Sequence, residues 1–177
     1  MAQKIKKHNS FFTLLISLLT LQACGIYSFT GASIPAGTET FQVNFFENNA
    51  GNRPGSIVEP GLDQDFTLAL QDILINQTNL NLASSNGDLV FEGEIVEYAI
   101  TPMSATAQNT AAQNRLTITI NVRYFNVKNE EDNYEKRFSF FYDFPAEQQL
   151  YDIKDTAHND IFDRITQDIF NASLAKW

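Results

Sequence analysis

The sequence predicts a two-layer α+β domain, in which a mostly antiparallel sheet of four strands carries two helices on one of its faces. Two periodicities support this fold class. Apolar residues alternate with polar ones in four segments, as in strands with one buried face, and recur every three or four residues in two segments, as in amphipathic helices. The order is strand, helix, three strands and helix. One sheet with both helices on its apolar face would bury the apolar faces of all six elements.

The first strand and the first helix lie between residues 41 and 74. Phe41, Val43 and Phe45 alternate with polar residues, which predicts a strand that ends in the turn-forming stretch 48–55. From Pro60 onward the apolar spacing changes to three and four, which predicts a helix of about four turns. The residues of its apolar face are Leu62, Phe66, Ala69, Leu70, Ile73 and Leu74.

Three further strands and a second helix follow. The apolar residues of 89–100 change parity after Ile95, which predicts a β-bulge or bend at that point. The segment 116–124 alternates without interruption, and 138–144 follows it across a polar hairpin loop at 128–133. The last helix presents its apolar residues at Ile161, Phe162, Ile165, Ile169 and Ala172.

The only cysteine of the chain closes an export signal. A basic segment with three lysines precedes an apolar run from residue 11 to 21, which is too short to cross a bilayer but has the length of a signal-peptide core. Leu21-Gln22-Ala23-Cys24 follows and is similar to the lipobox of bacterial lipoproteins. We therefore expect cleavage before Cys24 and its acylation with fatty acids such as palmitate. The alternative is an ordinary signal peptide that ends near Ala23 and leaves an unpaired thiol.

This interpretation divides the chain into a signal peptide (1–23), a lipidated tether (24–40) and a single α+β domain (41–177). The tether is rich in Gly, Ser, Thr and Ala, which is typical of an extended segment. Gly25 follows the cysteine, and the lack of an acidic residue at this position favours sorting to the outer membrane.

The mature chain is strongly acidic. The formal net charge of the whole sequence is −9, with 12 basic and 21 acidic residues. The signal peptide holds three of the basic residues and no acidic one, so the mature chain carries −12. This charge argues against a nucleic-acid partner and against broad electrostatic adhesion to anionic lipid or glycolipid, so that any anion site must be local.

Residues that could perform catalysis are few. His158 is the one histidine after the signal peptide, and we expect it to be a surface or capping residue at the start of the last helix. Glu92 and Glu94 share one strand face and are expected to be solvated acids rather than an acid–base pair. Without a second His or Cys the usual zinc and transition-metal ligand sets cannot form, and no glycine-rich phosphate loop is present. The sequence thus predicts a non-enzymatic protein without a cofactor or metal.

Four cations are the candidates for an anion site. Arg115 and Arg123 lie on the polar side of the third strand, and Lys136 and Arg137 lie at the start of the fourth, so a hairpin can gather some of them on one sheet face. Guanidinium groups suit phosphate or carboxylate recognition. The alternative is a surface ladder in which these cations neutralise nearby acids. The small, polar connection 101–114 is longer than a tight turn and is a candidate contact surface.

Five segments resemble the LptE family of lipopolysaccharide-assembly lipoproteins, in particular its Bacteroidetes branch. They are Cys24–Pro35, Phe66–Asp72, Phe91–Ile95, Asn114–Ile118 and Asp168–Asn171, and they cover the mature chain in order. The resemblance implies a lipid anchor in the outer membrane that faces the periplasm. It also implies a β-barrel partner, LptD, in which the lipoprotein sits as a plug and whose assembly it assists, and contact with lipopolysaccharide or lipooligosaccharide.

The resemblance itself assigns no residue to the glycolipid, so the four cations are candidate phosphate contacts by their placement alone. Two other functions stay open at this point. One is a freestanding periplasmic lipoprotein that binds a glycan or peptide, and the other is an envelope hydrolase. An assembly subunit should co-purify with a barrel in fixed stoichiometry, whereas a binding lipoprotein should be isolated alone.

Overall fold

The computed structural model describes residues 34–103 and 112–175, and these residues form two α-helices, six strands and two short 3-10 helices. In chain order the elements are β1 (Thr40–Val43), β2 (Glu47–Asn48), η2 (Ala50–Asn52), α2 (Leu62–Gln77), β3 (Asn81–Leu82), β4 (Leu89–Met103), β5 (Gln113–Asn126), η3 (Glu130–Asp132), β6 (Tyr134–Pro145) and α3 (Leu150–Leu174). The predicted signal peptide, Cys24 and most of the predicted tether lie outside the described residues.

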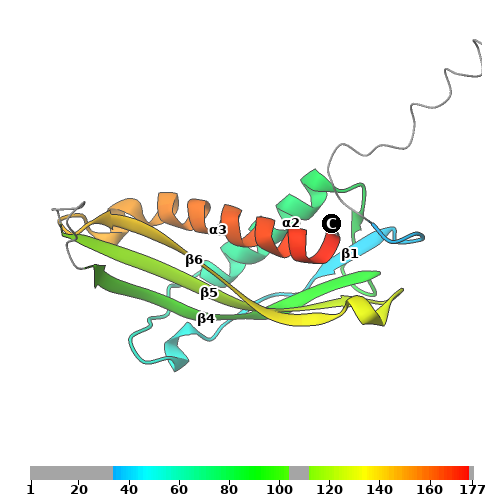
Figure 1. Cartoon of the computed structure of the whole chain (residues 1–177), viewed down its shortest axis with the longest axis horizontal. Coiled ribbons are helices and arrows are strands. Elements are labelled where there is room, and N and C mark those ends of the chain that lie inside the picture. Colours follow the sequence, from blue (N-terminus) through cyan, green and yellow to red (C-terminus); the bar gives the residue numbers. More distant parts are fainter. Residues whose placement is uncertain (1–33, 104–111, 176–177) are drawn as a thin grey trace, which may run out of the picture. The chain divides into compact units, whose positions relative to one another are not determined.

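The predicted α+β class is confirmed, and both helices lie on one side of the sheet (Figure 1). The sheet has six strands in the described residues rather than four, in the order β3-β1-β4-β5-β6, with β2 also paired to β4. The three long strands are antiparallel, whereas β1 is parallel to both β3 and β4. The two additional strands have two residues each, which is too short for an alternating pattern to be visible in the sequence.

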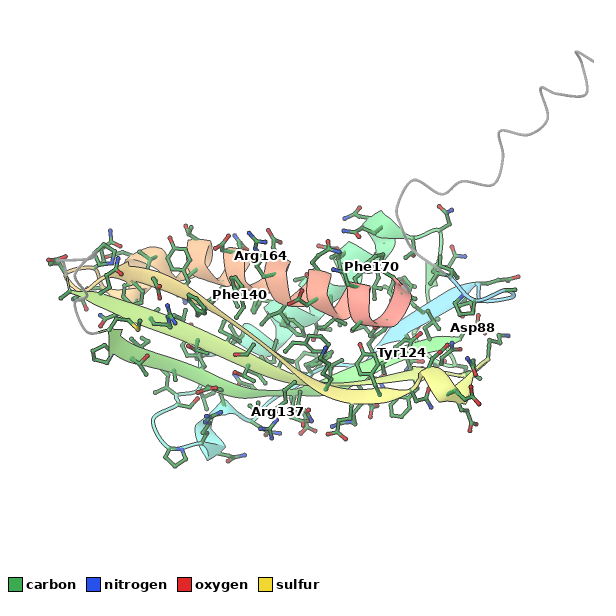
Figure 2. The ribbon with its side chains drawn as sticks, in the orientation of Figure 1. Asp88, Tyr124, Arg137, Phe140, Arg164 and Phe170 are labelled. Carbon is green, nitrogen blue, oxygen red and sulfur yellow. The ribbon has the colours of Figure 1, made fainter. Side chains whose placement is uncertain are left out.

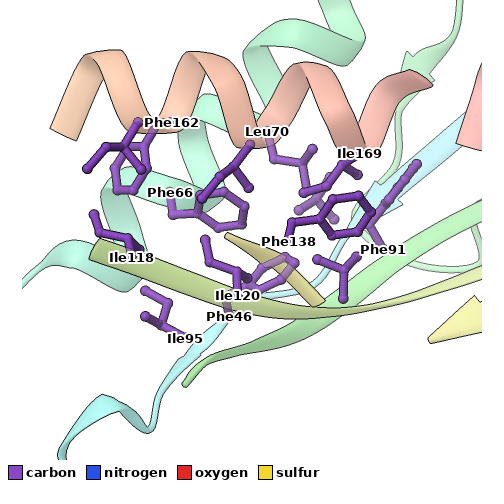
Figure 3. Close-up of a cluster of buried hydrophobic side chains, with 14 of the residues drawn as sticks. Phe46, Phe66, Leu70, Phe91, Ile95, Ile118, Ile120, Phe138, Phe162 and Ile169 are labelled. Carbon is purple, nitrogen blue, oxygen red and sulfur yellow. The ribbon is translucent and has the colours of Figure 1, made fainter. Parts of the chain in front are cut away.

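The hydrophobic core fills the space between the sheet and the helices. The Phe66 ring of α2 lies at its centre, 5.0 Å from the ring of Phe46 and 5.4 Å from that of Phe162 in α3, in edge-to-face contacts. Figure 3 shows this cluster above the buried face of β5. The fully buried residues that β5 contributes are Leu116, Ile118, Ile120 and Val122.

Gly93 of β4 lies on the core-facing side of its strand and has a steric reason to be glycine. A Cβ atom at this position would lie 2.8 Å from the Phe46 ring and would overlap the carbonyl oxygen of Asn121. The missing side chain thus lets Phe46 pack against the sheet below Phe66.

The predicted bulge in the second strand is confirmed. The register between β4 and β5 shifts between Ile95 and Glu97. Leu89, Phe91 and Ile95 are buried before the shift, and Tyr98 is buried after it. The bulge keeps the apolar residues of this long strand on the core side although their parity changes.

The prediction that Phe45 lies on the buried face of the first strand is wrong. The side chain of Phe45 is 60% exposed, whereas Phe46 is fully buried. The chain leaves β1 after Val43, where the Asn44 N–H donates to the carbonyl of Phe91, and the Phe46 N–H then donates to Thr67 Oγ1 in α2. These long-range bonds end the strand at Val43, two residues before the last residue of the predicted alternation.

The last helix is longer than predicted, because it begins at Leu150 rather than near His158. Its first three turns carry mostly polar residues, which weakens the apolar stripe there. None of the helices in the described part of the chain is both long and apolar enough to span a membrane.

Candidate functional site

The face of the sheet that points away from the helices carries a continuous set of polar side chains, which we call the polar ladder. The register aligns Glu92 with Arg123 and Glu135, Glu94 with Asn121 and Arg137, and Glu97 with Thr119 and Ser139. Each row runs across β4, β5 and β6, and the alternation of the strands places all three rows on the outer face. The predicted placement of Glu92 and Glu94 on one face is therefore correct.

Arg123 is the centre of the first two rows. Its Nε lies 3.1 Å from Glu92 Oε1 and its Nη1 lies 2.9 Å from Glu94 Oε2. Asn121 extends the network, because its Nδ2 donates to Glu94 Oε1 and to Glu135 Oε1, both at 2.7 Å. The side chains of Arg123 and Glu92 are each about one third exposed, so the network lies at the protein surface and is partly screened by water.

The charge of Glu94 is held in place by its neighbours. Burial by itself would raise the pKa of Glu94, but the hydrogen bonds from Asn121 and Arg123 and the positive charges of Arg123 and Arg137 outweigh it, so its pKa is below the usual value. A carboxyl group that stays ionised is a poor general acid at neutral pH. This geometry favours a structural ion network over an acid–base pair.

In the third row, which consists of Glu97, Thr119 and Ser139, an arginine from outside the sheet also contacts the glutamate. Thr119 Oγ1 donates to Glu97 Oε2 at 2.9 Å and shares a 2.8 Å hydrogen bond with Ser139 Oγ, while Arg53 Nη1 contacts Glu97 Oε2 at 2.9 Å. Thr119 is 6% exposed and Asn121 is 8% exposed. The middle of the outer face is thus covered by hydrogen-bonded side chains.

Arg115 lies at the end of the sheet where the predicted connection 101–114 begins and ends. Its Nε and Nη2 contact the two carboxylate oxygens of Asp143 at 2.7 and 2.8 Å, and its guanidinium carbon lies 3.5 Å from the ring centroid of the exposed Phe141. β4 and β5 extend to Met103 and Gln113, so most of the predicted connection outside them, residues 104–111, lies beyond the described residues.

The four candidate cations do not form one cluster. Arg115, Arg123 and Arg137 lie on the outer face, whereas Lys136 pairs with the core-facing Val122 and lies on the helix side. Figure 2 shows Arg137 on the side of the sheet opposite to α3. Arg115 and Arg123 are held by carboxylates, as the ladder alternative expects, and this binding of the guanidinium groups raises the pKa of each arginine.

Three cations have no ion pair within the described part of the chain, namely Lys136, Arg137 and Arg164. Arg164 on α3 was not among the cations that the sequence singled out. Its guanidinium carbon lies 5.8 Å from the ring centroid of Phe140 in β6 (Figure 2). The Lys136 ammonium lies 5.0 Å from the ring of Phe138 on the same strand. Only the folded structure places Arg164 over β6, the strand that carries Lys136 and Arg137, so no local signal could have related the three.

The expectation for His158 is wrong. His158 is 7% exposed, its Nε2 lies 3.0 Å from the hydroxyl of Tyr98, and its ring stacks on Phe162. Burial lowers the pKa of His158 and favours the neutral ring. Its spacing of three and four residues from Ile161 and Phe162 places it on the same buried stripe, and this spacing was the signal that could have revealed it.

The described residues offer no group of three His, Cys, Asp or Glu side chains that could hold a metal ion. A hollow of about 490 Å³ lies between α2 and α3, beside His158. Its acidic lining consists of Asp65, Asp72, Asp155 and Asp163. This lining disfavours an anionic ligand in the hollow.

A family model described as Lipopolysaccharide-assembly, LptE, matches residues 38–173. No curated protein matches the chain. A solved structure of a hypothetical protein from Chlamydia trachomatis is similar at a TM-score of 0.52 and 11% identity, over 79% of this chain and 100% of that chain.

Two further solved structures are similar at lower scores. A minor lipoprotein from Acinetobacter baumannii matches at a TM-score of 0.48 and 12% identity, over 79% of this chain and 98% of that one. The rare lipoprotein B from Shewanella oneidensis matches at 0.40 and 9% identity, over 74% and 89%.

Proposed function

We propose that this chain, which belongs to the LptE family of lipopolysaccharide-assembly proteins, is the outer-membrane lipoprotein subunit of the lipopolysaccharide translocon, where it plugs an LptD-type β-barrel and assists its assembly. The observation that carries the proposal is the match over residues 38–173. This match includes all described strands and both helices except the last residue of α3. It therefore concerns the whole domain rather than one motif.

A non-enzymatic role is supported by the state of the groups that could have been catalytic. His158 is buried against Tyr98 and Phe162, so its ring nitrogen is engaged within the core. The carboxylates of Glu92 and Glu94 are bonded to Arg123. A hydrolase would need an accessible nucleophile–base pair, which these contacts do not provide.

The lipid anchor is proposed at Cys24, on the periplasmic face of the outer membrane. Mass spectrometry of the mature amino terminus should show an acylated Cys24. A Cys24→Ala variant should accumulate as an uncleaved precursor in the inner membrane. A mature chain with a free thiol, or one that begins elsewhere, would contradict both the anchor and the location.

The polar ladder is compatible with a position inside a barrel. The lumen of an outer-membrane barrel is polar, so a plug needs a surface of hydrogen-bonding groups rather than a broad apolar face. The ladder offers such a surface across β4, β5 and β6. Exposed apolar side chains next to the sheet, including Ile57 and Val58, can add contact area and thus affinity without any contribution from net charge.

Contact with glycolipid phosphate is proposed on the outer face. Of the four candidate cations, Arg137 is the best placed, because it has no ion pair in the described residues and lies in the row of the polar ladder next to that of Arg123. Arg115 would contribute only by exchanging Asp143 for a phosphate. Lys136 would reach a phosphate only from the helix side.

The glycolipid contact can be tested by charge reversal. Arg137→Glu should weaken binding of purified lipopolysaccharide or lipooligosaccharide to the intact lipoprotein, while barrel association stays intact. Lys128→Glu, in the hairpin loop and paired with Asp88, is the control with the same change in charge. An equal loss of binding in both variants would indicate a nonspecific charge effect and would contradict a phosphate site at Arg137.

The function as a whole is tested by depletion and co-purification. Depletion of the protein should leave the barrel misassembled and the glycolipid stalled on the periplasmic side. Detergent extracts should yield the lipoprotein and the barrel in a fixed stoichiometry. If depletion leaves barrel and surface glycolipid at normal levels, and the protein is isolated alone with a bound glycan or peptide, the binding-lipoprotein alternative replaces this proposal.

A further inference from the structure

The two edges of the sheet differ in length and in protection. One edge is the two-residue strand β3, and the other is β6, which has twelve residues and pairs only with β5. The opposite side of β4, by contrast, is paired between Leu89 and Tyr98 by β1, by β2 and by the Ile57 N–H, which donates to the carbonyl of Tyr98. Among the described strands, β6 therefore offers the longest edge that could accept another strand.

The direction of the backbone groups of β6 follows from its pairing. The Ala146 N–H donates to the carbonyl of Ala112, and this pair continues the register that joins Pro145 to Gln113. In an antiparallel ladder the bonding residues alternate, so even-numbered residues of β6 point their N–H and C=O groups toward β5. The residues whose groups point outward are Glu135, Arg137, Ser139, Phe141 and Asp143.

These outward groups have no partner in the described part of the chain. No backbone or side-chain hydrogen bond from the described residues reaches them. The register of β6 with β5 is also regular from Tyr134 to Pro145. The register shift in this sheet lies between β4 and β5. A regular, unbulged edge with free N–H and C=O groups is a template for strand addition.

The charges along this edge are unusual for such an acidic protein. The three described cations without an ion pair, Lys136, Arg137 and Arg164, all lie on β6 or directly above it. Lys136 and Arg164 lie on the helix side, above the rings of Phe138 and Phe140. A hollow between β6 and α3 is lined by Lys136, Arg137 and Phe138, with Asp168 of α3 as its one acidic residue. Unneutralised cations at one edge of a chain with a formal net charge of −9 favour an acidic partner there.

We propose that β6 is a docking edge for an extended segment of a partner protein, which adds to the sheet as a further strand and places acidic side chains opposite Lys136 and Arg164. Backbone hydrogen bonds would supply affinity, and the two cations would select for carboxylates at alternate positions of the added strand. This assignment takes Lys136 from the phosphate candidates and leaves Arg137 among them. It does not require that the partner is the barrel proposed above.

The edge is tested first by photocrosslinking in cells that produce the full-length lipoprotein. A photoreactive phenylalanine analogue is placed at Glu135, Ser139 or Phe141, one site at a time. The expected result is one crosslinked protein. Its attachment points should lie on a single segment and should be separated by the same numbers of residues as the three sites on β6. Crosslinks only to glycolipid, only to a second copy of this chain, or to scattered segments of a partner would each overturn the proposal.

A backbone variant then separates strand addition from side-chain contact. Ser139→Pro removes an outward N–H and the hydroxyl bonded to Thr119, and it leaves the backbone hydrogen bonds to β5. Ser139→Ala loses the same hydroxyl but keeps the N–H. Crosslinking from Glu135 should fall about tenfold in Ser139→Pro and stay near the wild-type level in Ser139→Ala. If Ser139→Pro fails to accumulate, Arg164→Glu on the exposed side of α3 provides a second test and should reduce the yield by a similar factor.

The two proposals fail independently. If the barrel does not co-purify while β6 crosslinks one other protein in register, the docking edge stands and the barrel function falls. If the barrel co-purifies but Ser139→Pro and Arg164→Glu both crosslink as well as the wild-type protein, the docking edge is wrong.

Discussion

In the middle of β5 the two faces are nearly equally buried, but they are buried by different means. On the helix side Ile118, Ile120 and Val122 are fully buried in an apolar core. On the outer side Thr119 and Asn121 are 6% and 8% exposed, and each forms two hydrogen bonds to neighbouring strands. Low exposure of a strand residue therefore does not show that a second apolar layer covers it, because hydrogen-bonded side chains can exclude water as well.

The largest effect is expected on the apolar face. Ile120→Asp would place an unpaired carboxylate among fully buried side chains, which should cost several kcal/mol and unfold a domain whose stability is about 5–15 kcal/mol. Urea denaturation of the mature protein followed by circular dichroism measures this loss. Ile120→Val, which removes one methylene, is the matched control and should cost only about 1 kcal/mol.

The same charge on the outer face should have a smaller effect. Thr119→Asp would lose two hydrogen bonds and place a carboxylate next to Glu97, so we expect a loss of about 2 kcal/mol. Thr119→Ser keeps the hydroxyl and should remain near the wild-type stability. If the urea midpoints of Thr119→Asp and Ile120→Asp were equally low, the two faces would be alike and the outer face would have to be covered by a second layer.

The buried pair of Tyr98 and His158 links the sheet to α3 and makes stability depend on pH. Burial lowers the folded-state pKa of His158 below 6.5, although the charges of Glu59, Asp65 and Asp155 favour protonation. The unfolded chain therefore binds a proton first as the pH falls through 6.5. The contribution of the neutral His158 ring to the free energy of unfolding is complete above pH 6.5. It declines below this pH, by at most about 1.4 kcal/mol per pH unit.

The urea midpoint of the wild-type protein should accordingly decrease between pH 7.5 and pH 5.5. His158→Gln, which has no titrating ring, should show a flatter profile over the same interval. Parallel profiles for the two proteins would mean that His158 is not held neutral in the core.

The smallest effect on stability is expected for a substitution of Asp88, which lies just before β4 and is hydrogen-bonded to the start of β1 (Figure 2). Its Oδ2 accepts hydrogen bonds from the backbone N–H groups of Glu39 and Thr40 and from Thr40 Oγ1, and its Oδ1 contacts Lys128. The bond from Glu39, followed by the contact with Lys128, holds the pKa of Asp88 well below its usual range.

Because this folded-state pKa is lowered, the stabilisation by Asp88 is present above the usual carboxyl pKa of about 4 and is lost as the pH falls below it. Asp88→Asn should therefore lower the urea midpoint slightly at pH 7, and the difference from the wild-type protein should shrink toward pH 3. A difference that stays constant with pH would show that the charge of Asp88 contributes nothing. Thr40→Val, which removes one of the donors, is the matched control.

The prediction from sequence was most accurate where a long segment has one face in the core. β5 and β6 appear with the predicted parity, and the bulge in β4 lies at Ile95 as expected. It was least accurate near chain reversals. Phe45 was assigned to the core in place of Phe46 because the end of β1 is set by hydrogen bonds to β4 and α2, which lie more than 20 residues away.

The sequence by itself determined the order of the main elements, their apolar faces and the membership of a family, because periodicity and motifs are local properties of the chain. Only the tertiary structure decided that β1 lies parallel to β4, that His158 is buried, and that Arg115 and Arg123 are occupied by carboxylates. It also decided that Lys136 and Arg137 of β6 and Arg164 above Phe140 have no ion pair in the described residues. Ion pairs and edge strands depend on which distant segments meet, and the pairing of segments is decided by the packing of the whole core.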